Sequence, residues 1–402
     1  MDADRLRSFA ELSLKVGANI APGQVVAIKC FYDHAPLARA LTEVAYEMGA
    51  EFVDVWYWDP YTKSARVEHA SEASLSWTPP WLHARYDWLV ENGGALVQVS
   101  GDPVPDLLSD QDPRRAGADA MPRLRSVIEL VHSGKVNWTY VACASPGWAE
   151  VVYGEPDVDR LWDDLFSFMR LDQADPMTAW KEHVDRLAER SKALNDRRFD
   201  GIRFTGPGTD LFVGLLPSSN WNAATMVTDK GREYVANMPT EEVFTTPDMR
   251  RVEGVVRSTR PLALHGTIVE NLEVEFAGGK VSAVRASKGK EIVEGEMAKP
   301  GGDRLGEVAL VDGSSPIGKT GRTFFDILID ENATCHIAYG AGYPQGVDGG
   351  QTMSATELEA LGVNMSEVHT DFMIGGPEVT VTGVDADGHE TPIIVDDIWQ
   401  LT

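Results

Sequence analysis

The spacing of apolar residues divides the chain into two parts, each with its own pattern of apolar and polar residues. Before residue 196, short apolar runs typical of buried strands alternate with stretches that have the i, i+3, i+4 spacing of amphipathic helices. The predicted strands cover 25–28, 52–56, 95–100 and 138–143, and the predicted helices cover 4–18, 34–48, 80–92, 113–132 and 158–195. Strands that alternate with helices favour parallel pairing through right-handed crossovers. The first part is therefore predicted to be an α/β domain with a mostly parallel sheet.

Beyond Gly201 the apolar runs become shorter, several alternate with polar residues, and Gly-rich turns separate some of them. These features are typical of antiparallel strands. The predicted strands cover 202–204, 211–215, 251–256, 272–276, 280–284, 379–384 and 392–395, with helices near 323–330 and 354–362. The second part is predicted to be a β-rich α+β domain. Because Asn195-Asp196 interrupts the helical pattern, the expected domains are 1–196 and 197–402.

Length and charge limit the classes of partner. A chain of 402 residues is long enough for two domains. Acidic residues outnumber basic ones by 62 to 36, which gives a formal net charge of −26. Such a surface repels nucleic acids and anionic membranes, so we expect neither as a partner.

Location can be predicted from what the sequence lacks. No apolar run is long enough to span a bilayer, and the first residues do not have the pattern of a signal peptide. The three cysteines, Cys30, Cys143 and Cys335, are far apart and fit neither a disulfide framework nor a CxxC metal site. We expect a cytoplasmic protein.

The α/β part carries little sign of chemistry. It has neither a GxGxxG motif nor a Walker motif, so nucleotide binding has little support. His34 follows the first strand at its C-terminal end, where α/β sheets often bind ligands. An isolated histidine at such a place is more often a helix-start or surface residue.

Candidate chemistry concentrates in the second part. Glu307 lies inside the apolar run 306–311, and another apolar run ends in Asp330-Glu331-Asn332 and is followed by His336. Charged side chains beside apolar runs are costly to bury unless they are paired or bind a metal. Glu307 is thus a candidate ligand, and His336 is either a ligand or a core histidine.

Two further clusters carry acids. Glu241-Glu242 lies between Pro239 and Pro247, which favour an extended segment. Adjacent residues of an extended segment point in opposite directions, so at most one of the pair is expected to coordinate a given metal directly. The other can support a ligand from outside the metal's coordination sphere or act as a base. The alternative is an exposed acidic loop. His369 and Asp371 are two positions apart, so in an extended segment they share a face and can approach one metal ion together. The alternative is a surface salt pair.

Together these clusters are too rich in carboxylates for one zinc ion but suit two divalent cations that share a carboxylate. Aminopeptidases and phosphatases both use such paired ions. The residues alone leave the choice between the two reactions open.

The longer motifs resemble the thermophilic aminopeptidase T/AmpS/PepS family of metallopeptidases. The resemblance covers nearly the whole chain. It rests on Asn-Met-Pro-Thr-Glu-Glu-Val-Phe-Thr (237–245), Gly-Glu-Val-Ala-Leu-Val (306–311), 330–340 with Tyr343-Pro344, His-x-Asp-Phe-Met-Ile-Gly (369–375), Gly206–Leu211, 19–24 and 45–50.

The resemblance implies a metal-dependent exopeptidase that removes N-terminal residues from peptides with a free N-terminus. It also implies an N-terminal α/β domain, a C-terminal catalytic domain, a homodimer, and two divalent ions (Zn, Co or Mn). The ligands that it implies are Glu241, Glu307, His336, His369 and Asp371, with Glu307 as the bridge and Glu331 as a further acidic residue at the site. Within this scheme Glu242 is the candidate general base, exchangeable with Glu241, and Tyr343 is the donor to the developing oxyanion.

Two other functions stay open beside this one. The first is a dinuclear metal hydrolase of another bond, such as a phosphoester. The second is a non-catalytic relative that binds a metal or another ligand.

Overall fold

A computed structural model describes residues 2–119, 121 and 125–401. These residues form two compact units. The first runs to His183 and also takes in Ala224–Thr240, and the second consists of Val184–Ala223 and the chain from Glu241 onward. The expected domains 1–196 and 197–402 stay a prediction, since a compact unit is defined by packing and not by independent folding.

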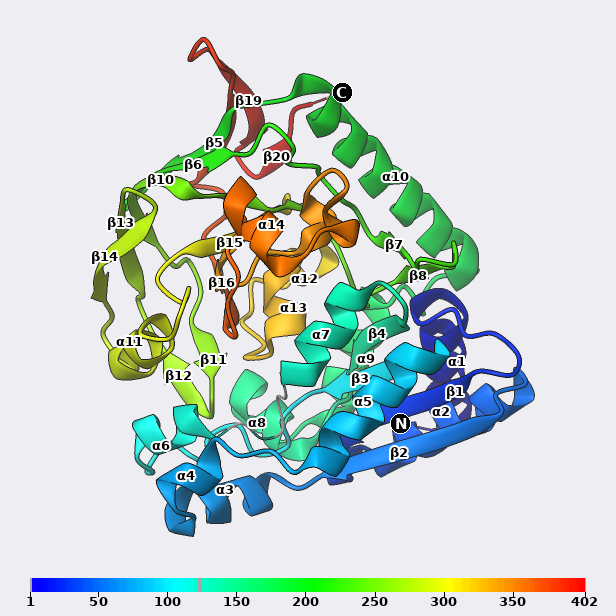
Figure 1. The fold of residues 1–402 in the computed structure, drawn as a ribbon. Helices are drawn as coiled ribbons and strands as arrows, with labels where there is room; N and C mark the ends of the chain where they lie inside the picture. Colours follow the sequence, from blue (N-terminus) through cyan, green and yellow to red (C-terminus); the bar gives the residue numbers. More distant parts are fainter. Residues whose placement is uncertain (1, 120, 122–124, 402) are drawn as a thin grey trace. The chain divides into compact units, whose positions relative to one another are not determined.

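A four-stranded parallel sheet forms the centre of the first unit (Figure 1). Its strands are β1 (Val25–Phe31), β2 (Phe52–Trp58), β3 (Ala95–Ser100) and β4 (Asn137–Ala142). The order is β2-β1-β3-β4, and every neighbouring pair is parallel. The predicted parallel sheet is therefore confirmed, with each strand at its expected position. A separate two-stranded ribbon joins β7 (Thr225–Val227) to β8 (Glu233–Val235).

Helices precede, connect and follow the strands of this sheet. They are α1 (Ala3–Leu12), α2 (Ala35–Glu47), α3 (Pro60–His69), α4 (Glu72–Leu75), α5 (Pro80–Asn92), α6 (Pro113–Ala118), α7 (Arg125–Ser133), α8 (Pro146–Tyr153), α9 (Val158–Phe168) and α10 (Pro176–Arg197), which continues into the second unit. The expected helix 4–18 continues beyond α1 as a π-helical turn, Ser13–Gly17. No helix within the described residues is both long and apolar enough to cross a membrane.

Two expected helices are each divided in the structure. The predicted helix 113–132 consists of α6 and α7, and its residues 120 and 122–124 lie outside the described part. The predicted helix 158–195 consists of α9 and α10. Arg170 between them has a φ of 56°, which a continuous right-handed helix does not allow.

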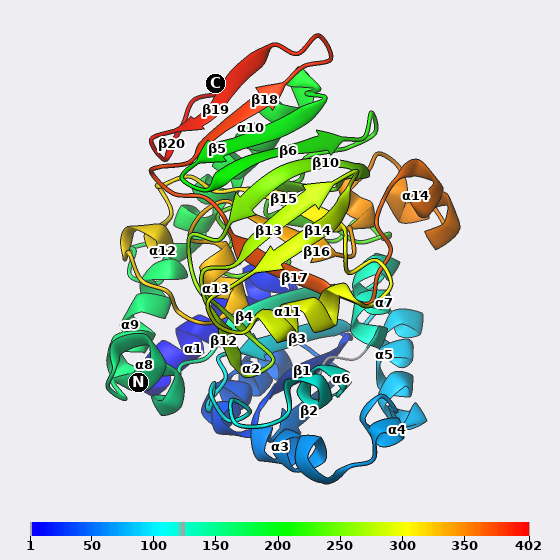
Figure 2. The same cartoon turned by 90° about the vertical axis from the view of Figure 1, so that its left-hand side faces the viewer.

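An eight-stranded antiparallel sheet dominates the second unit (Figure 2). Its order is β14-β13-β10-β6-β5-β18-β19-β20. The strands are β5 (Gly201–Gly206), β6 (Thr209–Leu215), β10 (Pro247–Arg257), β13 (Glu273–Ala277), β14 (Lys280–Arg285), β18 (Thr380–Val384), β19 (Glu390–Val395) and β20 (Ile398–Trp399). The predicted antiparallel, β-rich character of the second part is confirmed.

A smaller antiparallel sheet, in the order β17-β16-β15-β9, carries the chemistry of this unit. Its strands are β9 (Val243–Thr245), β15 (Leu305–Leu310), β16 (His336–Gly340) and β17 (His369–Met373). Strand β10 of the large sheet contacts β15. This unit also contains the hairpin β11 (Leu262–Leu264) and β12 (Thr267–Val269), and the helices α11 (Lys290–Met297), α12 (Pro316–Lys319), α13 (Ile327–Glu331) and α14 (Ala355–Leu361).

Candidate metal centre

One face of the small sheet gathers four of the candidate side chains. Glu307 on β15 lies opposite Ala338 on β16, and Ala338 lies opposite Asp371 on β17. Alternate residues of a strand share a face, so His369 lies on the same face as Asp371, and His336 on the same face as Ala338. The predicted extended conformation of 369–371 is confirmed, and His369 Nε2 lies 3.5 Å from Asp371 Oδ2.

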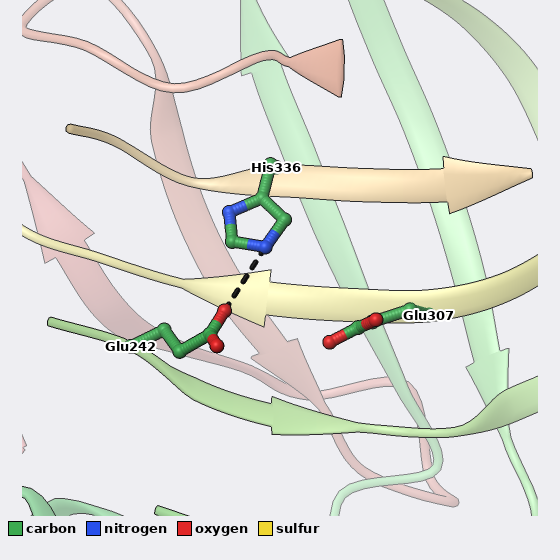
Figure 3. A group of neighbouring side chains, drawn as sticks. All are labelled: Glu242, Glu307 and His336. Carbon is green, nitrogen blue, oxygen red and sulfur yellow. Dashed lines mark ion pairs between the residues drawn. The ribbon is translucent and has the colours of Figure 1, made fainter. Parts of the chain in front are cut away.

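Two more carboxylates reach this face from outside the strands. Glu242 immediately precedes β9, and its Oε2 lies 3.0 Å from His336 Nε2 (Figure 3). Glu331 is the last residue of α13. On the sheet itself, Glu307 Oε2 lies 3.2 Å from His369 Nε2. Both histidines are thus in ion-pair contact with carboxylates.

The donor atoms form three overlapping groups, in each of which all atoms lie within 4.8 Å of one another. The groups are Glu242 with Glu307 and His336, Glu307 with His369 and Asp371, and Glu331 with His336 and Asp371. Imidazole nitrogens and carboxylate oxygens are the donors that Zn²⁺, Co²⁺ and Mn²⁺ accept in proteins. The residues present therefore fit divalent cations, and their overlap fits more than one.

Glu241 is placed differently from its neighbour. It is buried, but none of the donor groups found among the described residues includes it. Its backbone N–H donates to Asn332 Oδ1 at 2.7 Å. Of the two adjacent glutamates, it is Glu242 that joins the other candidates.

The acids of this cluster resist ionising together. Burial raises the pKa of Glu307 to about 7, assisted by the charges of Asp371 and Glu242 and opposed by His369. Burial also raises the pKa of Glu331 well above its usual value, and Asp371 and Glu242 add to the effect. Like charges at short range in a dry site are costly unless a cation lies between them.

The histidines respond in the opposite sense. Burial lowers the pKa of His336, but the hydrogen bond and charge of Glu242 outweigh it and raise the value to about 10. Burial likewise opposes the rise in the pKa of His369, which Tyr343, Asp371 and Glu307 bring about. No lysine or arginine is among the main charged neighbours of these described groups. The main charged groups around these described side chains are thus carboxylates and the two histidines.

Tyr343 lies at the edge of this cluster. Its ring centroid is 4.8 Å from that of His369, and Thr246 Oγ1 donates to its carbonyl at 2.7 Å. Burial raises the pKa of Tyr343 above its usual value, so the hydroxyl stays protonated and can donate a hydrogen bond.

Sequence reasoning missed two residues that shape the site and weighed a third only for its charge. Ala338 is the small residue between Glu307 and Asp371, and only the strand register reveals this. Asn332 joins the Glu241 segment to α13, since its Nδ2 donates to Leu328 O at 2.8 Å. Asp330 belongs to no donor group among the described residues, and its carboxylate accepts from the backbone N–H of Phe324 at 2.7 Å.

A buried face of carboxylates and histidines that fits divalent cations is the kind of site that metal-dependent hydrolases use. Comparison with known proteins agrees. The profile described as thermophilic metalloprotease (M29) matches residues 2–399. The chain belongs to this family of metalloproteases.

Several relatives match over their full length. The chain is 41% identical to aminopeptidase T of Thermus aquaticus, over 100% of both chains. It is 37% identical to aminopeptidase PepS of Streptococcus thermophilus, over 99% of this chain and 98% of that protein. The solved structure of wild-type AmpT from Thermus thermophilus has a TM-score of 0.88 and 39% identity, and the match covers 99% of each chain. The mixed α/β fold is shared with that structure.

Proposed function

We propose that this metallo-aminopeptidase removes single residues from the N-termini of peptides with the help of two divalent cations, Zn²⁺, Co²⁺ or Mn²⁺. The observation that carries the proposal is the overlap of three donor groups on one face of the small sheet. The names of the full-length relatives, aminopeptidase T and aminopeptidase PepS, support the choice of reaction. The residues that would hold the ions are Glu242, Glu307, Glu331, His336, His369 and Asp371.

Glu307 is the residue that would contribute to holding both ions. It is in one donor group with Glu242 and His336 and in another with His369 and Asp371. The distances favour Glu242 over Glu241 as the ligand of the Glu-Glu pair, which exchanges the roles that the family resemblance first suggested. A carboxylate shared between two ions is the arrangement of many dinuclear hydrolases.

When bound, divalent cations in such a site supply a water of lowered pKa as nucleophile and a positive charge that polarises the scissile carbonyl. The protein's own contribution includes the hydroxyl of Tyr343. It stays protonated and is positioned by the contact with the ring of His369. We propose that it donates a hydrogen bond to the carbonyl oxygen as negative charge develops there, a role worth about 2.7–4 kcal/mol.

The substrate, the oligomeric state and the cellular location are part of the same proposal. The substrate is a peptide with a free α-amino group, whose positive charge suits an acidic chain of net charge −26. We also propose a homodimer in the cytoplasm, on the basis of the family resemblance. All three cysteines are free and buried, as a reducing compartment would allow.

The test combines metal analysis with matched substrates. Protein treated with a chelator should lose hydrolysis of aminoacyl-anilides and of peptides with a free N-terminus, and should regain it with Zn²⁺, Co²⁺ or Mn²⁺. The same peptides with an acetylated N-terminus should stay intact. Activity that survives complete metal removal would refute the metal proposal, while equal cleavage of acetylated peptides or turnover of phosphoesters alone would refute the aminopeptidase proposal.

A further inference from the structure

The rear face of the small sheet, opposite the candidate ligands, carries a buried polar network. Thr370 lies between His369 and Asp371 on β17, so its side chain points to the other face of the sheet. It is paired with Tyr339 of β16. Thr370 Oγ1 and the Tyr339 hydroxyl both donate to Glu296 Oε2, at 2.8 Å and 2.7 Å. One carboxylate oxygen thus joins two directly opposed residues of the strands that carry three candidate ligands.

The other oxygen of Glu296 has its own partner. Glu296 Oε1 lies 2.6 Å from Nε2 of His265. His265 and Gly266 form the two-residue turn between β11 and β12, with φ angles of 50° and 77°, as a type I′ hairpin turn requires. That turn directs the imidazole toward α11. The carboxylate of Glu296 is therefore held from three elements at once.

These contacts keep Glu296 ionised in a buried place. Burial opposes ionisation, but the hydrogen bond and charge of His265, with the hydroxyls of Tyr339 and Thr370, hold the pKa of Glu296 at about 2. Hydrogen bonds to an ionised acceptor are roughly twice as strong as neutral ones. The network thus resists any shift of Thr370 relative to Tyr339.

We propose that Glu296 is a positioning residue of the metal centre, because it fixes the backbone of Thr370 and thereby the directions of His369 and Asp371 on either side. The inference rests on the proposed function only in requiring that the site binds divalent cations. The partners that orient ligands from outside a metal site commonly change metal affinity 10- to 100-fold when they are removed. Glu296 would act in the same way, but through the strand backbone and not through a bond to a ligand.

The test is cobalt binding to metal-free protein, measured by the visible absorption of Co²⁺ and by competition with a chromophoric chelator. Glu296→Ala should weaken Co²⁺ binding about 10- to 100-fold and alter the absorption bands. Glu296→Gln should restore most of the affinity, because its amide oxygen still accepts from Thr370 and Tyr339. Its NH₂ can donate to a neutral His265. Thr370→Val keeps the shape of the side chain, removes one hydrogen bond, and should show a smaller loss in a folded protein.

The matched control is Asp312→Asn. Asp312 is also buried in the second unit, and Arg190 donates to it at 3.1 Å and 2.7 Å, but it belongs to neither β16 nor β17. This variant should lower stability without changing Co²⁺ affinity. Wild-type affinity in both Glu296→Ala and Thr370→Val would overturn the positioning role and leave the proposed function intact. A wild-type protein that binds no Co²⁺ would overturn the proposed metal centre and this inference with it.

Discussion

Glu307 and Asp371 lie in one row across three antiparallel strands, with only Ala338 between them. Side chains of directly opposed residues have their Cβ atoms about 4.5–5.5 Å apart. The Cβ atoms of Glu307 and Asp371 are therefore two such steps apart. Because the side chain of Ala338 is a single methyl group, the carboxylate oxygens of Glu307 and Asp371 can occupy the space above the middle strand. A larger residue at 338 would take the volume in which ions would lie.

Ala338→Val should therefore weaken metal binding with little harm to the β structure. Valine favours strands, but its branch would stand between the carboxylates of Glu307 and Asp371. We expect at least a tenfold loss of Zn²⁺ affinity by competition titration. The control is Val308→Ile, which adds a carbon to the rear face of the same sheet. Equal metal affinity in Ala338→Val and the wild type would show that the ions do not lie over this row.

The two adjacent glutamates should behave differently. Glu242→Gln weakens the contact with His336 and takes a charge out of the donor group, so it should lower bound metal and abolish peptide hydrolysis. Glu241→Gln keeps the backbone hydrogen bond to Asn332 and should leave the metal content unchanged. Metal content is measured by mass spectrometry after gel filtration. A Glu242→Gln protein that keeps its metal but loses turnover would return Glu242 to the role of general base.

Tyr343→Phe removes only the hydroxyl of this residue and so tests the role of that group alone. The ring contact with His369 is retained, so metal content and KM should stay near the wild-type values. Loss of a donor to a developing oxyanion typically lowers kcat by about 10²- to 10³-fold. Steady-state kinetics on a free-amine peptide separate the two parameters. A change in KM alone would assign Tyr343 to substrate binding and remove it from the stabilisation of the transition state.

Much of the fold was predictable because the apolar pattern that indicates a strand or helix lies within a single segment of the chain. The strands of the parallel sheet are compact apolar runs, and the alternation of strands and helices limits the topology to a few choices. The shared face of His369 and Asp371 follows from the two-residue period of any strand. The sequence did not predict the break between α9 and α10. The spacing of apolar residues carries no information on the positive φ of Arg170.

The arrangement of the site was less predictable, because it depends on pairing between distant segments. The direction of Glu242 is set by β9 lying next to β15. The position of Ala338 between Glu307 and Asp371 is evident only from the register of three strands. The network around Glu296 joins α11 to a hairpin turn and to two strands, with no pattern along the chain to reveal it. Sequence reasoning found the chemical groups, and the fold determines which of them meet.

The environment of His34 in the first unit was also not predictable from the sequence, and it leads to a prediction on the pH dependence of stability. The sequence suggested a helix-start or surface residue. His34 is indeed the N-cap residue of α2, but it is fully buried, and its Nε2–H donates to the carbonyl of Gly101 at 2.9 Å. Its Nδ1 has no hydrogen-bond partner among the described residues. Burial lowers the pKa of His34 from 6.5 to about 4, although the hydrogen bond to Gly101 opposes the shift.

A depressed histidine pKa makes the folded state less stable in acid. Between pH 6.5 and about 4 the unfolded chain binds a proton that folded His34 does not, so stability falls as the pH falls through this window. The full shift corresponds to about 3 kcal/mol. His34→Gln keeps a donor for Gly101 and removes the titration, so it should flatten this part of the profile. The measurement is hydrogen exchange of peptides from β1 and β3 at pH 7, 5.5 and 4.5, compared between variant and wild type at each pH. His389→Gln at an exposed position is the control and should follow the wild type. Identical profiles for His34→Gln and the wild type would mean that His34 takes up its proton while β1 and β3 stay folded.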